Sequence, residues 1–186
     1  MKILVAGNKN YGLTKAIYNL HPEATYLSRS TGYDLTDSFI QSTVAKMSLE
    51  YDVFISVSCL QKFNQVRLIE EIMNQWWKQN HTGYLIALGS SADTPVKGTK
   101  WSYPVEKKAL RAYCRQQGQA IASETPPNWR VTYLSPGNMH TPNQDIKMPK
   151  IPKLDTAYVA EVIDWLIQQP THINISELCL DRIQNE

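Results

Sequence analysis

The amino-acid sequence predicts a single-domain α/β protein, built on a doubly wound parallel sheet with helices on both faces. Two observations lead to this fold class. Short apolar segments rich in β-branched residues alternate along the chain with longer segments whose apolar residues recur at three- and four-residue steps. The first five of the six short segments show little alternation between polar and apolar residues, which is typical of strands covered on both faces.

Six segments have the composition expected of strands. In chain order they are residues 2–6, 24–27, 52–58, 84–88, 130–134 and 174–180. Helices are expected between them, and the best-defined apolar stripe runs through Phe63, Val66, Ile69, Met73 and Trp76. There is neither an internal repeat nor an interdomain linker, so residues 1–186 are expected to fold as one domain.

Residues 141–154 are the one irregular stretch of the chain. Prolines at positions 142, 149 and 152 prevent a long helix there and favour a partly extended loop. We expect this segment to form a short substrate flap beside a binding site, rather than a domain boundary.

The composition and charge exclude several classes of protein. Hydrophobic residues make up 42% of the 186 residues and charged residues 19%, which is ordinary for a folded protein. The net charge of +2 is spread along the chain, so we expect no binding to nucleic acid or to a membrane. The three cysteines lie far apart without metal-binding spacing, so we expect reduced thiols, no metal site and a cytoplasmic protein.

The first expected strand leads into a turn with two glycines, and a helical segment follows. Glycines in such a turn let backbone amides approach a pyrophosphate at the amino end of the helix. A plain strand–helix turn would have a similar sequence, so this signal alone leaves nucleotide binding open. The turn residues that would contact a dinucleotide are Gly7, Asn8, Lys9, Asn10, Tyr11 and Gly12.

The second expected strand ends in a serine and an arginine. A site that selects NAD usually has a carboxylate here for the ribose 2′-hydroxyl, whereas a nearby arginine suits the 2′-phosphate of NADP. Ser28 is neutral and Arg29 is cationic, and Lys9 adds a second cation from the first turn. A solvated surface arginine is the ordinary alternative. If a dinucleotide binds, NADP(H) suits these residues better than NAD(H).

A tyrosine and a lysine four residues apart, Tyr103 and Lys107, follow the fourth expected strand. Such a pair is common by chance on a helix surface, and only its context favours catalysis. Ser90 lies just beyond residues 84–88, and the turn Pro136–Gly137 follows residues 130–134. Because the carboxyl ends of parallel strands meet at one edge of a sheet, we expect these residues to lie near one another.

Together these residues resemble the signature of the short-chain dehydrogenase/reductases, and the resemblance covers nearly the whole chain. The matching pattern is Ser90, then Tyr103-x-x-x-Lys107, then Pro136-Gly137-x-x-x-Thr141. The resemblance implies a Rossmann-type fold, catalytic roles for Ser90, Tyr103 and Lys107, and a water held by Asn64 in a proton relay. Beyond the glycine turn, the cofactor contacts that it implies are Ser28, Arg29, Asp34, Leu35, Ser56, Val57, Ser58, Tyr103, Lys107, Pro136, Gly137, Met139 and Thr141.

These side chains suit the interconversion of a carbonyl and an alcohol. Reduction of a carbonyl leaves negative charge on oxygen, which a positioned proton donor must meet. A free tyrosine has a pKa of about 10. We expect the Lys107 ammonium to lower the pKa of Tyr103, and Ser90 to orient the carbonyl oxygen. The function implied is an NADP(H)-dependent oxidoreductase for a small carbonyl or alcohol.

The chain also departs from the family pattern. Tyr11 and Leu13 stand where the family's turn has glycine, and a positive φ at Asn10 is expected to replace the lost freedom. This departure supports the alternative function, a dinucleotide-binding regulatory or scaffold protein of the same fold without turnover.

The resemblance further implies a homodimer or homotetramer. Its contacts would come from the two helices that carry the Trp76 and Tyr113 stripes, because large aromatic side chains are frequent in the cores of interfaces. The same side chains would be equally at home in the core of a monomer.

Overall fold

The computed structural model of the chain describes residues 1–94, 100–119 and 127–183. These residues contain a six-stranded sheet with the order β2-β1-β3-β4-β5-β6, in which every neighbouring pair is parallel. The strands are β1 (Ile3–Ala6), β2 (Thr25–Leu27), β3 (Val53–Ser56), β4 (Gly83–Leu88), β5 (Trp129–Pro136) and β6 (Glu177–Leu180). The predicted fold class is confirmed.

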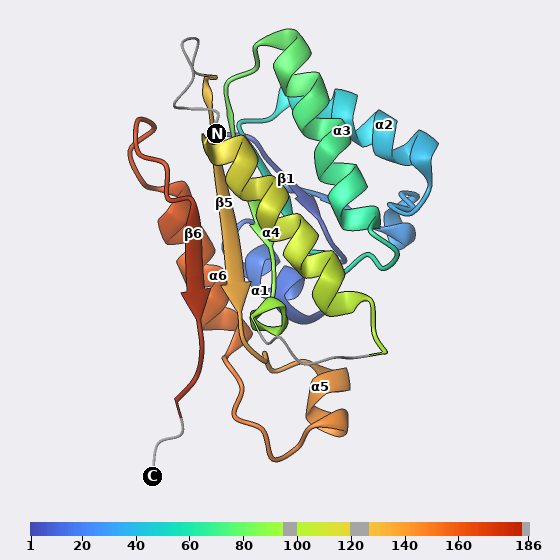
Figure 1. The fold of residues 1–186 in the computed structure, drawn as a ribbon, viewed down its shortest axis with the longest axis vertical. Coiled ribbons are helices and arrows are strands. Elements are labelled where there is room, and N and C mark those ends of the chain that lie inside the picture. Colours follow the sequence, from blue (N-terminus) through green and yellow to red (C-terminus); the bar gives the residue numbers. More distant parts are fainter. Residues whose placement is uncertain (95–99, 120–126, 184–186) are drawn as a thin grey trace.

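Helices cover both faces of the sheet. They are α1 (Gly12–Leu20), α2 (Ser38–Met47), α3 (Asn64–Gln79), α4 (Tyr103–Gln119), α5 (Pro142–Lys147) and α6 (Thr156–Ile167), with short 3₁₀ turns η1 (Arg29–Thr31), η2 (Ser48–Glu50) and η3 (Ser91–Asp93). Buried side chains of α2, α3 and α4 form one apolar cluster with the sheet, and those of α1 and α6 form the other. In Figure 1, α4 crosses in front of the strands and α6 lies behind them. No helix in the described ranges has the length and apolar character that crossing a bilayer requires.

The sixth strand is shorter than predicted, since it begins at Glu177 rather than at residue 174. The residues before Glu177 also lie beside β5, but some of their hydrogen bonds to this strand involve side chains. The amide of Val131 donates to the side-chain oxygen of Asn174 at 2.8 Å, and the Thr132 hydroxyl donates to the carbonyl of Ile175. A side-chain amide thus takes the place of a ladder partner, which ends the regular pairing early.

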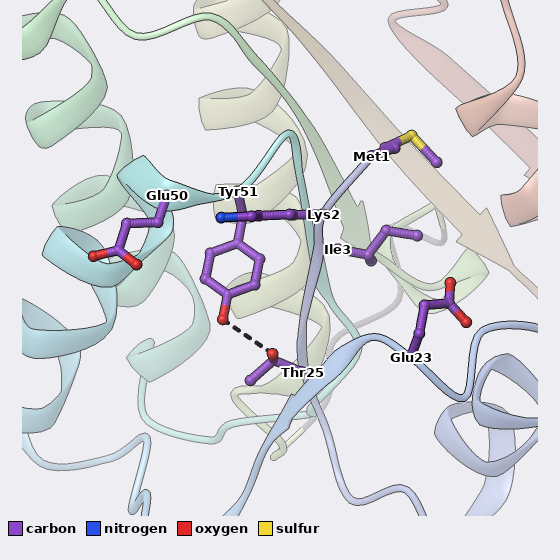
Figure 2. A pocket seen from close by; sticks show the side chains of 7 residues that line it. All are labelled: Met1, Lys2, Ile3, Glu23, Thr25, Glu50 and Tyr51. Carbon is purple, nitrogen blue, oxygen red and sulfur yellow. Dashed lines mark hydrogen bonds between the residues drawn. The ribbon is translucent and has the colours of Figure 1, made fainter.

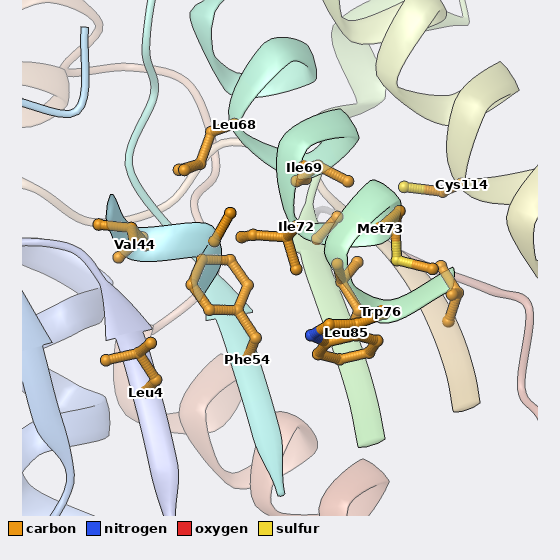
Figure 3. Close-up of a cluster of buried hydrophobic side chains, with 14 of the residues drawn as sticks. Leu4, Val44, Phe54, Leu68, Ile69, Ile72, Met73, Trp76, Leu85 and Cys114 are labelled. Atoms are coloured by element: carbon orange, nitrogen blue, oxygen red, sulfur yellow. The ribbon is translucent and has the colours of Figure 1, made fainter. Parts of the chain in front are cut away.

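Trp76 forms the centre of the cluster on the α3 side of the sheet. Its side chain is 0% exposed, its ring lies 6.5 Å from that of Trp129, and its indole nitrogen donates to the Ser48 hydroxyl at 3.0 Å. Figure 3 shows Trp76 grouped with Phe54 and Leu85 from the neighbouring strands. Trp76 is therefore a core residue of a single chain, and its side chain is not available for the subunit contact expected of this stripe. A homodimer or homotetramer stays a prediction.

The flap at residues 141–154 is less extended than predicted, because it contains the one-and-a-half-turn helix α5. Thr141 caps this helix by accepting a hydrogen bond from the Gln144 amide at 3.3 Å, and Pro142 occupies its first turn. Proline is tolerated at that position, where the missing N–H has no helical partner. The helix ends at Lys147, just before Pro149, so the prolines prevent a long helix as expected.

Replacing Trp76 with Ala should lower the free energy of unfolding by about 3–5 kcal/mol, because it leaves a large cavity in the core. Trp165→Ala on α6 is the matched control, since that tryptophan is 48% exposed. It should cost less than about 1 kcal/mol. Urea unfolding of both variants and of the unmodified chain measures the difference. Equal losses for the two tryptophans would contradict the placement of Trp76.

Candidate functional site

The strand order reverses between β1 and β3, which places a crevice beyond the carboxyl ends of these neighbouring strands. Ligands of open parallel sheets bind in such crevices. The turn after β1 and the segments after β2, β3, β4 and β5 all start from this edge. In Figure 1 the arrowheads of β5 and β6 point to the end of the molecule where α5 lies. The candidate site is therefore bounded by strand ends on one side and by the flap helix on the other.

The turn after β1 presents the amino end of α1 to this crevice. Tyr11 is the N-cap residue in an extended conformation, no side chain caps the helix, and its first turn contains no acidic residue. Gly12 has a φ of 51°, a conformation that strongly favours glycine. The Asn10 amide donates to the Asn8 side-chain oxygen at 3.0 Å. The positive φ predicted for Asn10 is wrong, because Gly12 supplies it.

This turn fits the pyrophosphate of a dinucleotide. Uncapped first-turn amides and the positive end of the helix dipole favour an anion, and no carboxylate in that turn opposes it. Gly7 is needed for another reason, since a Cβ there would lie 2.4 Å from the Thr14 hydroxyl oxygen. The close approach of Gly7 to α1 keeps the helix against the end of β1.

At the end of β2, Arg29 and Asp34 form an ion pair. The guanidinium Nε lies 3.1 Å from the Asp34 carboxylate, and the Arg29 side chain is 72% exposed. Hydrogen bonds from Thr36, followed by Arg29, lower the pKa of Asp34. Ser28 precedes this pair and caps the short turn η1. Leu35 is buried in the core, so its side chain does not reach the site. The sequence assigned Arg29 and Asp34 to separate contacts, and the structure brings them together.

The segment that leaves β3 lies against the end of β1. The amides of Val57 and Ser58 both donate to the carbonyl of Ala6, at 3.0 and 2.8 Å. Ser56 is buried, and its hydroxyl accepts a hydrogen bond from the Gln65 side chain at 3.2 Å. Of the three predicted cofactor contacts in this segment, only Ser58 is partly exposed.

Ser90 and Tyr103 meet at the carboxyl end of β4. Ser90 caps η3, and Tyr103 is the first residue of α4. Burial raises the pKa of the Tyr103 phenol, and a hydrogen bond with Ser90 opposes the rise. The lowered pKa expected for Tyr103 is not found. Lys107 lies one turn away with its ammonium 5.5 Å from the centre of the Tyr103 ring, and it is directed to other acceptors.

Lys107 is buried, with only 4% of its surface exposed. Its ammonium donates to the side-chain oxygen of Gln65 at 2.7 Å and to the carbonyl of Leu88 at 2.9 Å. Burial lowers the pKa of Lys107 to about 8. The ammonium is thus held by two neutral oxygens, and no ion pair with a carboxylate is formed by it among the described residues.

Gln65, the residue after Asn64, makes a direct contact with Lys107 that the sequence analysis did not predict. The Asn64 side chain donates to the backbone carbonyl of Gln61 at 2.8 Å. The backbone carbonyl of Asn64 accepts a hydrogen bond from the Gln41 side chain. The sequence contained a signal for Gln65. It lies three and four residues before Leu68 and Ile69, so it is a polar residue within a buried helical stripe.

A buried network on the other side of Ser90 fixes the serine loop. The Tyr133 hydroxyl donates to the Asp93 carboxylate at 2.7 Å and accepts a hydrogen bond from the Ser90 amide at 3.3 Å. Arg111 lies 3.4 Å from the same carboxylate. Burial, followed by the hydrogen bond to Asp93, raises the pKa of Tyr133. The Tyr133 ring occupies the space beside Gly89, where a Cβ would lie 2.0 Å from the ring.

The turn after β5 leads the flap back to the glycine turn. Pro136 is buried at the strand end, the Gly137 amide donates to the carbonyl of Leu180 at 2.7 Å, and Met139 pairs with Leu154. A Cβ on Gly12 would lie 3.2 Å from the Thr141 methyl group. The Asn143 amide also donates to the Tyr11 hydroxyl at 3.4 Å. Thr141 therefore borders the same turn as the amino end of α1.

The described residues contain no group of three histidine, cysteine, aspartate or glutamate side chains that could hold a metal ion. A pocket of about 320 Å³ lies at the opposite edge of the sheet. Figure 2 shows it between the chain start and the amino ends of β1 and β2, where the Tyr51 hydroxyl donates to Thr25 at 3.0 Å. It is separate from the Ser90–Tyr103 site.

Known proteins were found that resemble this chain in sequence or in fold. No protein-family profile matches the sequence. An uncharacterized oxidoreductase of Staphylococcus saprophyticus is 27% identical over 153 residues, which is 82% of this chain and 61% of that protein. The chain thus spans less than two thirds of the length of this curated relative.

Solved structures with the same fold include a short chain dehydrogenase/reductase family protein, with a TM-score of 0.76, 14% identity and coverage of 97% of this chain and 95% of that one. A 4-hydroxyisoleucine dehydrogenase complexed with NADH has a TM-score of 0.75, 16% identity and 97% coverage of both chains. A small-chain dehydrogenase in complex with NADPH has a TM-score of 0.72, 16% identity and coverage of 98% and 96%. The fold is that of these dehydrogenases.

Replacing Gly89 with Ala should lower the free energy of unfolding by about 2–3 kcal/mol, because the Tyr133 ring must move and its hydrogen bond to Asp93 is lost. Urea unfolding measures the loss. Gly118→Ala in α4 is the control, since its Cβ meets nothing closer than 3.4 Å. In a Tyr133→Ala background the Gly89→Ala change should cost less than about 1 kcal/mol. The same cost in both backgrounds would contradict the contact.

Proposed function

We propose that this chain is an oxidoreductase of the short-chain dehydrogenase/reductase type, which interconverts a carbonyl and an alcohol on a small substrate with NADP(H). The observation that carries the proposal is the placement of Ser90 just after β4 and of Tyr103 at the start of α4, with the buried Lys107 ammonium 5.5 Å from the centre of the Tyr103 ring. The uncapped amino end of α1 stands at the same edge of the sheet. The fold of the neighbouring dehydrogenases and the oxidoreductase relative support it.

A nicotinamide dinucleotide, when bound, supplies or accepts the hydride. The protein would supply position and protons. The Ser90 hydroxyl would hydrogen-bond the substrate oxygen, and the Tyr103 phenol would donate a proton to that oxygen as charge develops on it. Because burial raises the pKa of Tyr103, the phenol keeps its proton at neutral pH. The site is thus suited to carbonyl reduction, whereas alcohol oxidation requires a phenolate and therefore alkaline conditions.

The residues that would hold the dinucleotide lie at the carboxyl edge of the sheet. The first-turn amides of α1 would bind the pyrophosphate, and Thr141 would border the nicotinamide end. Lys107 keeps one ammonium proton for a ribose hydroxyl, since two of its three are donated to Gln65 and Leu88.

We assign the preference to NADP(H) because Ser28 replaces the usual carboxylate and Arg29 stands beside it. The Asp34 carboxylate lies 3.1 Å from the Arg29 Nε, so it would compete with the 2′-phosphate for this side chain. A 2′-phosphate carries more charge than a carboxylate and would draw the exposed guanidinium away from Asp34.

The second candidate function is a dinucleotide-binding regulatory protein without turnover. It is favoured by the contacts of Lys107, because two of its three ammonium protons are donated to Gln65 and Leu88 and none to the phenol oxygen in the described contacts. Both functions require dinucleotide binding, and only the first requires Tyr103 chemistry.

NADPH should bind more tightly than NADH, because only NADPH has the 2′-phosphate. Arg29→Ala should weaken the affinity for NADPH by about tenfold and leave the affinity for NADH unchanged. Quenching of the five tryptophans during titration reports binding of both cofactors. Asp34→Asn is the matched change. It should tighten NADPH, since it releases Arg29 and removes a nearby negative charge. Equal affinity for the two cofactors would remove Arg29 from this role.

Tyr103→Phe should lower the rate of carbonyl reduction by about 10² to 10⁴-fold, because the proton donor is lost while the ring is kept. Folding and cofactor binding should be unchanged. Tyr113→Phe on the same helix is the control and should keep full activity. In the unmodified protein, alcohol oxidation should rise throughout the alkaline range as the phenol loses its proton. Full activity of Tyr103→Phe against a carbonyl panel would reject the mechanism, and binding without any turnover would favour the regulatory function.

A further inference from the structure

Gln65 is a buried amide at the point where α3, α4 and two strands meet. It is 3% exposed, although it lies in the otherwise apolar stripe of α3. Its amide nitrogen lies 3.1 Å from the carbonyl of Leu88 and 3.3 Å from that of Ser56. Its amide oxygen accepts from the Lys107 ammonium at 2.7 Å. Each polar atom of this side chain therefore has a partner from a different element.

The orientation of the Gln65 amide follows from these partners. Carbonyl oxygens only accept hydrogen bonds, so the two carbonyls from Leu88 and Ser56 require the amide nitrogen on their side. The amide oxygen must then face Lys107. A reversed amide would place its NH2 group against the ammonium and its oxygen against the two carbonyls, which burial makes costly.

We propose that Gln65 is the positioning residue for Lys107, and that its amide oxygen holds the ammonium at the carboxyl end of β4. Leu88 completes a closed set, since its carbonyl accepts from both Lys107 and Gln65. The ammonium is thereby fixed on the side of the site that faces β3 and β4. Its role in turnover rests on the proposed function, whereas the contact itself does not.

The entry into α3 is built to hold Gln65 in place. Lys62 and Phe63 have positive φ values of 59° and 60°, a left-handed conformation that costs free energy in residues other than glycine. The Phe63 amide donates to the Glu106 carboxylate of α4 at 3.2 Å. A carboxylate one residue before Lys107 thus fastens the start of the helix that carries Gln65.

The oxygen of Gln65 also affects how firmly Lys107 keeps its proton. Burial lowers the pKa of Lys107 to about 8, and Cys59, Cys114, Glu106 and Asp93 oppose this from the surrounding elements. Glu106 itself is bound to Ser102 and to the amide of Phe63. In the part of the chain that the structure describes, the Gln65 oxygen is the side-chain atom that accepts a hydrogen bond from the ammonium, at 2.7 Å. Its removal should therefore weaken the protonated form.

The test is a titration of Lys107 in the full chain without cofactor, followed by ¹³C NMR of labelled lysine side chains. The Lys107 signal is the one absent from Lys107→Met. Gln65→Glu should raise the pKa of Lys107 and Gln65→Met should lower it, each by about one unit, because one adds a negative charge and the other removes the acceptor. A residue that merely fills space would not move the titration in opposite directions.

Gln41→Met is the matched control. Gln41 is also a buried glutamine, and it donates to the carbonyls of Leu35 and Asn64 without contacting Lys107. It should cost similar stability and leave the Lys107 titration unchanged. If Gln65→Met does not fold, Gln65→Asn replaces it, since the shorter amide cannot reach the ammonium and should also lower the pKa. The same Lys107 pKa in the unmodified chain and in all Gln65 variants would overturn the proposal.

A second measurement separates this proposal from the proposed function. If the chain reduces a carbonyl, the pH profile of turnover should shift with the Lys107 titration in each variant. If it reduces none, the NMR titration still decides the role of Gln65. Shifted titrations without turnover reject the oxidoreductase and keep the positioning residue, whereas turnover with unshifted titrations does the reverse.

Discussion

All six strands run in the same direction, and this constraint decides where chemistry is possible in the molecule. Parallel strands require crossover connections, and the crossover helices cover both faces of the sheet. The faces are therefore filled by packed apolar side chains, with Trp76 at the centre of one of them. A ligand can therefore approach the sheet at the strand ends rather than on its covered faces. The carboxyl ends lie together at one edge, where the reversal of strand order opens a crevice.

At this edge the protein buries two charged groups, Lys107 and Asp93, and gives each of them hydrogen-bond partners. Lys107 is held by a side-chain amide and a backbone carbonyl, and Asp93 is held by the Tyr133 hydroxyl and Arg111. Asp93 belongs to the turn that Ser90 caps, and Lys107 binds the carbonyl of Leu88 just before Ser90. Losing any of these partners would leave a charge in a low-dielectric interior, so the loop is strongly constrained. Such a preorganised donor is what a reaction that develops charge on oxygen requires.

The glycine turn keeps its geometry although two of the expected glycines are absent. Tyr11 has a φ of −139° and a ψ of 136°, an extended conformation that accepts a side chain without strain. Within the turn at residues 7–12, the left-handed conformation is found at Gly12 alone. The Tyr11 hydroxyl accepts a hydrogen bond from the Asn143 amide, so the larger side chain connects the turn to the flap. Tyr11 therefore adds a hydrogen bond between this turn and residues 141–154, which a glycine could not make.

The sequence alone determined the fold class, the order of the strands and helices along the chain, and the strand ends at which Ser90, Tyr103 and Lys107 stand. These properties depend on hydrophobic periodicity and on turn residues, which are local in the chain. Only the tertiary structure decided that Gln65 meets Lys107, that Arg29 pairs with Asp34, and that the pKa of Tyr103 is raised. Each of these depends on how deeply a group is buried and on side chains brought in from other elements, because desolvation and hydrogen bonding act through space rather than along the sequence.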